Sequence, residues 1–208
     1  MLVQLALQAP KINIEDSGFT QRPRRFSPGS DVSYGLVIKN ARARSDAVNV
    51  TLLVNFVDES NRILGSAHDR ISRLPANARI TYGGQQAIPT QDQVVRLEVI
   101  VGATSDTREL AMPPLISDVI IAPRSSEPYV DSVRGQLLNT RANPMRSGTV
   151  GVIILDVEGG IIGGGAGYAS GPLAFGAREA FSVSGSFTAI PFAKAAAAVV
   201  SVVPNYDD

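Results

Sequence analysis

The chain has 208 residues, a length that fits one large domain or two domains of about 100 residues each. Its 44% of hydrophobic and 18% of charged residues exclude a disordered chain, and its 19 acidic and 19 basic residues cancel, which argues against a nucleic-acid or anionic-lipid partner. The absence of Cys excludes disulfide frameworks, cysteine nucleophiles, Cys-ligated zinc and iron–sulfur clusters.

Residues 1–25 are predicted to form a strand-like N-terminal arm. Val3, Leu5 and Leu7 alternate with polar or small residues, which is the period of a half-buried strand. The segment has no basic start and no long apolar stretch, so we do not interpret it as a signal peptide. Two pairings stay open for this arm: with the edge of its own domain, or with a neighbouring molecule by donation of a strand.

The next feature along the chain is an internal repeat. Apolar residues at every second position lead to Asp58 in the first half and to Asp156 in the second, 98 residues later. An Ile-Leu-Gly or Ile-Ile-Gly triplet follows each Asp at the same distance, and Leu74 and Leu173 continue the match at a spacing of 99. A period near 100 residues is that of a complete small domain and too long for a solenoid.

The last strand of the second unit is the least certain element, because Lys194–Ala198 favours helix by propensity. The repeat aligns Val95 and Leu97 of the first unit with Lys194 and Ala196, which predicts a strand there. We follow the repeat, since tertiary context overrides propensity in so short a run.

Within both units the pattern is that of β-strands. Short apolar runs of period two alternate with turn residues, and no stretch has a sustained helical pattern. The sequence therefore predicts an all-β chain of two tandem immunoglobulin-like antiparallel β-sandwiches behind the arm. The predicted boundaries are 1–25 for the arm, 26–104 for the first sandwich, 105–114 for a proline-containing linker and 115–208 for the second sandwich.

A family resemblance rests on these strand and turn positions. The runs Phe26–Gly29, Val32–Asn40 and Ala47–Thr51 resemble the opening of bacterial and archaeal immunoglobulin-like modules of cell-surface and S-layer-associated proteins. Both units also resemble FxLYD-type and cell-adhesion-related bacterial domains. The resemblance implies a location at the cell surface or outside the cell and a role in binding or assembly. The composition itself leaves a cytoplasmic location open.

Few residues suggest chemistry. His68 is the single histidine, and its neighbours Ser66 and Asp69 do not build a catalytic triad, because adjacent strand residues point to opposite faces. Asp58 and Asp156 occupy turn positions in different units, which argues against a carboxylate pair. We predict no catalytic residue, no cofactor and no metal site, and hence no enzyme.

A glycine-rich stretch at Glu158–Gly171 holds seven glycines in fourteen residues. It lacks a phosphate-binding motif, and we interpret it as a hairpin followed by a bulged strand that permits close backbone approach, or as a flat surface on which another subunit packs. The candidate interaction residues are Val3, Leu5 and Leu7 of the arm and Gly163, Gly164, Gly165, Gly167 and Tyr168 of this stretch.

The predicted function is a non-catalytic interaction or structural subunit of a cell-surface or extracellular assembly, which associates through sheet edges and the arm. Its partners would be proteins, with self-assembly into a homo-oligomer or filament as one form, and no segment is predicted to span a membrane. The alternative is a ligand-binding module for glycan or peptide within a larger exported protein.

Overall fold

The structure, a computed structural model, describes residues 12–106, 112–125 and 127–206. Within these ranges the chain is all-β, with one 3-10 helix of three residues at Phe192–Lys194 and no α-helix. None of the helical segments described has the length and apolar character needed to cross a membrane. The strands are β1 (Ile12–Pro23), β2 (Ser30–Asn40), β3 (Asp46–Val57), β4 (Ile63–Leu74), β5 (Arg79–Ile88), β6 (Arg96–Asp106), β7 (Leu115–Pro123), β8 (Val130–Leu138), β9 (Met145–Leu155), β10 (Ile161–Leu173), β11 (Arg178–Ser184) and β12 (Ala197–Tyr206).

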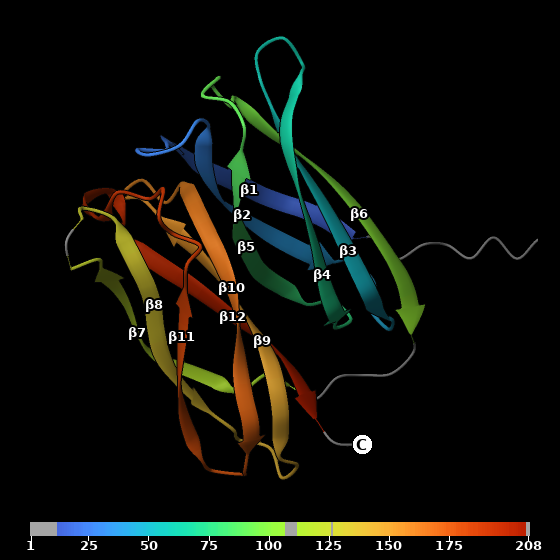
Figure 1. Ribbon diagram of the computed structural model, residues 1–208. Coiled ribbons are helices and arrows are strands. Elements are labelled where there is room, and N and C mark those ends of the chain that lie inside the picture. Colours follow the sequence, from blue (N-terminus) through green and yellow to red (C-terminus); the bar gives the residue numbers. More distant parts are fainter. Residues whose placement is uncertain (1–11, 107–111, 126, 207–208) are drawn as a thin grey trace, which may run out of the picture.

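The strands form four antiparallel sheets of three strands each (Figure 1). Sheets β1-β2-β5 and β4-β3-β6 enclose one apolar core, and sheets β11-β8-β7 and β10-β9-β12 enclose a second. The second pair of sheets repeats the strand order of the first pair. All described strand pairings lie within residues 12–106 or within 115–206, so we refer to these ranges as the first and second unit.

The repeated Asp residues make the same turn in both units. Asp58 and Asp156 follow β3 and β9, and the Oδ1 atom of each accepts hydrogen bonds of 2.8 to 3.0 Å from the backbone N–H groups two and four residues further on. Asn61 and Gly159 occupy the matching turn position with φ of 62° and 84°. Asn and Gly are the residues that tolerate this left-handed conformation, so the sequence match reflects turn chemistry.

A second repeated feature is a fully buried asparagine, which is the last residue of β2 in the first unit and the residue directly after β8 in the second. The Nδ2 atom of Asn40 donates to the Leu74 carbonyl at 3.2 Å, and that of Asn139 donates to the Leu173 carbonyl at 2.9 Å. Each Oδ1 atom accepts from the backbone N–H two residues later, at 3.2 Å and 2.9 Å. Each asparagine thus links the two sheets of its unit: Asn40 connects the end of β2 to the end of β4, and Asn139 connects the end of β8 to the end of β10.

The predicted alignment of the last strand is wrong by two residues. Phe56 of β3 pairs with Leu97, whereas the equivalent Ile154 of β9 pairs with Ala198, so the spacing here is 101. The second unit is two residues longer between β11 and β12, in the segment that contains the 3-10 helix. Lys194 therefore belongs to that helix, and the strand begins at Ala197.

The region predicted as a separate arm includes the first strand of the first unit. Residues 12–23 form β1, which pairs with β2 of the same chain, and its counterpart in the second unit is β7, paired with β8. Of the two pairings left open for the arm, residues 12–23 therefore make the one with their own domain. Val3, Leu5 and Leu7 lie outside the described residues.

Candidate functional site at the junction of the two units

The two units pack against each other through the outer faces of sheets β1-β2-β5 and β10-β9-β12 (Figure 1). Glycines allow the two backbones to touch. A Cβ atom on Gly18 would lie 1.8 Å from the carbonyl oxygen of Ile161, and one on Gly151 would lie 1.9 Å from that of Thr81. No side chain fits at such distances, so these positions accept only glycine while the sheets are docked.

Short hydroxyl side chains satisfy the backbone groups that this contact buries. Ser33 Oγ donates to the Ser186 carbonyl at 2.6 Å, and Thr20 Oγ1 donates to the Ile162 carbonyl at 2.6 Å. Thr81 Oγ1 donates to the Gly151 carbonyl at 2.8 Å. Ser33 is fully buried, so these bonds replace water that the docking excludes.

An arginine from the arm region fastens the rim of the same junction. The guanidinium of Arg22 lies 4.2 Å from the ring centroid of Tyr129 and 3.8 Å from the carboxylate of Glu127. Arg22 belongs to the first unit and both partners to the second. A stacked, charge-paired arginine holds two surfaces in a fixed relation better than a solvated one.

The glycine-rich stretch forms β10, and its residues divide between two faces. Gly164 faces the first unit, where an added Cβ atom would lie 3.0 Å from the Cα atom of Gly35. Gly163 borders both units, since an added Cβ atom would lie 2.6 Å from Ile190 of the second unit and 2.8 Å from Ser33 Oγ of the first. A register shift marks a bulge at Gly163. The first unit of the same chain therefore occupies the part of this surface formed by Gly163 and Gly164.

The other predicted residues of β10 lie elsewhere. Gly165 and Gly167 face the core of the second unit, where added Cβ atoms would lie 2.8 Å from Phe187 and 3.1 Å from Val183. Tyr168 stands free of the junction with 83% of its surface exposed. The stretch therefore combines a docking face, an inner face and one exposed aromatic ring.

The free outer faces of the two units differ from the docked ones at equivalent positions. Gly35, which faces the second unit, corresponds to Arg134 on β8, and Gly151 corresponds to Leu53 on β3. Close backbone approach is thus possible on one face of each unit and blocked on the other. Three further docked residues have larger or more polar equivalents on the free face of the other unit: Gly83 is equivalent to Ser182, Ala166 to His68 and Ser201 to Ile100.

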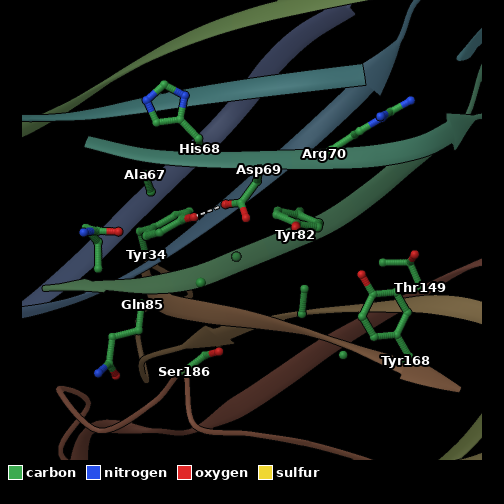
Figure 2. Close-up of a pocket in the computed structure, with 15 residues that line it drawn as sticks. Tyr34, Ala67, His68, Asp69, Arg70, Tyr82, Gln85, Thr149, Tyr168 and Ser186 are labelled. Carbon is green, nitrogen blue, oxygen red and sulfur yellow. Dashed lines mark hydrogen bonds between the residues drawn. The ribbon is translucent and has the colours of Figure 1, made fainter. Parts of the chain in front are cut away.

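A groove of about 290 Å³ opens at the side of the junction, between β4 and β5 of the first unit and β9 and β10 of the second (Figure 2). Tyr34 and Tyr82 lie at its floor and are buried, and the Tyr34 hydroxyl donates a hydrogen bond to Asp69 Oδ2. Gln85 lines one side of the groove and Tyr168 the other.

Both floor tyrosines are held in the neutral form. Burial raises the pKa of Tyr34 well above its ordinary value, and the charge of Asp69 and its hydrogen bond to the phenol raise it further. Burial is also the main reason why the pKa of Tyr82 is raised, followed by the charge of Asp69. The Tyr34 phenol therefore donates to the carboxylate, and neither phenol acts as an acid or a nucleophile near neutral pH.

The strand parity of β4 separates His68 from Asp69, as the sequence predicts. Asp69 points into the groove, whereas His68 is exposed and directed away from it (Figure 2). Ser66, the candidate hydroxyl, donates to Asn55 Oδ1 at 2.7 Å. The three residues therefore form no catalytic triad.

Asp58 and Asp156 remain turn residues in separate sandwiches. The backbone N–H of Arg62, followed by its guanidinium, stabilises the charged carboxylate and lowers the pKa of Asp58. Among the described residues no group of His, Asp and Glu is arranged to hold a metal ion.

The sequence reasoning missed the cluster of Tyr34, Asp69 and Tyr82. One signal was available: Ala67, Asp69 and Ile71 share one face of β4, and both neighbours of the acid belong to the core. An acid at a core-facing position requires a buried partner, and a tyrosine hydroxyl supplies it.

Comparisons with known proteins add little. No protein-family model matches the chain, and no curated protein matches it. Among solved structures, the crystal structure of red sea bream transglutaminase is similar with a TM-score of 0.27 and 14% identity, over 93% of this chain and 30% of that one. The chain spans under a third of that protein, and a likeness at this level carries no functional argument.

Proposed function

We propose that this protein is a non-catalytic interaction and structural subunit of a cell-surface or extracellular assembly. The observation that carries the proposal is the junction itself: buried hydroxyl bonds and direct backbone contact through glycine fix two sandwiches in one relation. A fixed pair of sandwiches presents its outer sheet edges at constant spacing, which suits a building element.

The edges supply the contact surface in this proposal. Leu115 and Ile120 on edge strand β7 are 59% and 62% exposed, and Ile100 on edge strand β6 is 59% exposed. An edge strand with apolar side chains offers unpaired backbone groups and apolar surface together, which is what strand addition uses. Residues 1–10, with alternating Val3, Leu5 and Leu7, are the proposed donor.

Each unit is proposed to be immunoglobulin-like. Its first, second and fifth strands share one sheet, and its third and sixth are neighbours in the other, which matches strands A, B, E and C, F of immunoglobulin domains. Together with the resemblance to bacterial surface modules, this order favours an extracytoplasmic location.

Size-exclusion chromatography with light scattering tests the proposal on the full chain, on a chain without residues 1–10 and on Ile120→Lys. We expect an oligomer that dissociates in both variants, because one loses the donor strand and the other places a charge on the acceptor edge. Val157→Lys is the matched control, since Val157 is 87% exposed but lies in the turn after β9. A full chain that stays monomeric at every concentration would contradict the proposal.

The second candidate function is a ligand-binding module. One observation favours it: Tyr168 is 83% exposed and lines the same groove as the Asp69 carboxylate. An exposed aromatic ring beside converging polar groups is typical of a binding site.

A further inference from the structure

We propose that the groove between the units binds one or two sugar rings of a neutral glycan, with Tyr168 as the stacking platform and Asp69 as the main hydrogen-bond acceptor. This inference deepens the second candidate function and is independent of assembly through the edges. Figure 2 shows the residues that carry it.

The floor of the groove presents a carboxylate in a fixed position. Asp69 Oδ2 accepts the hydrogen bond of Tyr34, whose ring is buried and packs edge-on against Phe56 at 5.7 Å between centroids. A carboxylate has lone pairs for about four hydrogen bonds, so Asp69 keeps acceptor capacity for sugar hydroxyls. A carboxylate held by a rigid donor costs a ligand little ordering entropy.

The wall of the groove presents an oriented amide. Thr188 donates to Gln85 Oε1 from its backbone N–H at 3.1 Å and from its hydroxyl at 2.7 Å. Because a backbone N–H only donates, this pair identifies the oxygen and leaves Nε2 of Gln85 as the donor that can serve a ligand. The groove is therefore lined by both an acceptor, the Asp69 carboxylate, and a donor, Gln85 Nε2. Sugar hydroxyls both donate and accept hydrogen bonds, so they can use both groups.

The rim presents the apolar surface. Tyr168 continues the docked strand β10, but it lies beyond the contact with the first unit and exposes 83% of its surface. One face of a pyranose ring carries C–H groups, and these pack on an aromatic ring while the hydroxyls at the ring edge reach polar groups. The equivalent residue of the first unit is Arg70, so the platform belongs to the second unit alone.

The size and charge of the groove restrict the ligand. Its volume of about 290 Å³ lies just below the ~300–1,000 Å³ of small-molecule sites, which fits a ligand of one or two rings. The ionic residues that line it are one acid, Asp69, and one base, Arg70, so their charges cancel and the groove has no excess charge to attract an ionic ligand. A neutral glycan has hydroxyls for the carboxylate and the amide and a C–H face for the ring, and all three groups line this groove.

The test uses the full chain and soluble gluco-, manno-, xylo- and chito-oligosaccharides at millimolar concentration. Two-dimensional amide NMR is the readout. We expect one of these sugars to shift the resonances of residues 67–70, 83–86 and 166–168, and its affinity to fall about tenfold or more in both Tyr168→Ala and Asp69→Asn.

Phe175→Ala is the matched control, because Phe175 is 69% exposed in the loop between β10 and β11 and does not line the groove. The affinity of Phe175→Ala should equal that of the unchanged protein. Both Tyr168→Ala and Phe175→Ala should keep dispersed spectra, since both positions are on the surface. If none of the four sugars shifts these resonances, or if binding survives Tyr168→Ala, the inference is overturned. A short peptide that shifts them in place of the sugars would also overturn it. The oligomeric state is measured separately, so either idea can fail alone.

Discussion

Replacement of Gly18 by Ala tests the contact that joins the two units. The added Cβ would lie 1.8 Å from the Ile161 carbonyl oxygen, and contacts of this kind are not shorter than 3.0 Å, so the backbones must separate by about 1.2 Å. That shift is enough to stretch the 2.6 Å bond from Thr20 to the Ile162 carbonyl beyond hydrogen-bond range.

The expected loss follows from these two effects. Overpacking costs about 1–3 kcal/mol and a lost buried hydrogen bond about 1 kcal/mol, so the free energy of unfolding should fall by about 2–4 kcal/mol. In a protein of this size Tm falls by roughly 2–4 °C for each kcal/mol. Scanning calorimetry measures the change, and small-angle scattering should show a larger radius of gyration if the units separate.

Gly102→Ala is the matched control for this substitution. Gly102 is also a strand glycine, but it lies on the free outer face of the first unit, where an added Cβ meets the Thr51 hydroxyl at 2.7 Å. A side-chain oxygen can rotate away, so the effect should be within about 0.5 kcal/mol. Equal stability and scattering for Gly18→Ala and the unchanged protein would refute the close approach of the two backbones.

Other substitutions address the repeated and buried polar groups. Asn40→Ala leaves buried carbonyls without a donor and should cost about 2–4 kcal/mol in urea unfolding. The pKa values of Tyr34 and Tyr82 are raised in the folded state, so the unfolded chain loses these protons first, at about pH 10. The free energy of unfolding is therefore unaffected below about pH 10 and falls above it. Tyr34→Phe should reduce this fall, as measured by calorimetry at several pH values. The lowered pKa of Asp58 has the opposite sign: its stabilisation is present above the unfolded pKa of about 4 and is lost on acidification, so Asp58→Asn should reduce the acid sensitivity measured by urea unfolding.

The sequence predicted the parts of the fold that depend on local chemistry. Strands and turns follow from short segments, such as the apolar alternation around Val54 and Val152 and the turn residues Asp58 and Asp156. Because the chain repeats, each of these patterns occurs twice, which strengthens the prediction. The register of the last strand depends on the length of the loop before it. That loop is two residues longer in the second unit, so an alignment at a constant spacing of 99 places Lys194 on the strand incorrectly.

The candidate site was harder to predict because it is made of contacts between distant residues. The glycine-rich strand indicated close backbone approach, but nothing local to Gly163 says whether its partner is a second molecule or the first unit of the same chain. Asp69 and Tyr168 line one groove only because the two units dock, and Gly35, which permits that docking, carries no local motif that marks it.

The docking of two similar units raises the question of what stops further units from adding. The internal junction joins the β1-β2-β5 face of the first unit to the β10-β9-β12 face of the second, which are not equivalent faces. The same contact between molecules would therefore be heterologous and would build a ring or an open filament. The counterparts of the docked glycines oppose such a contact, because Arg134 lies at the position equivalent to Gly35 and Leu53 at the position equivalent to Gly151. A duplicated sandwich has therefore kept its small residues on the faces that meet and bulky or charged ones on the faces that do not. A repetition of the contact inside the chain is therefore disfavoured between molecules, and the proposed assembly through sheet edges does not depend on it.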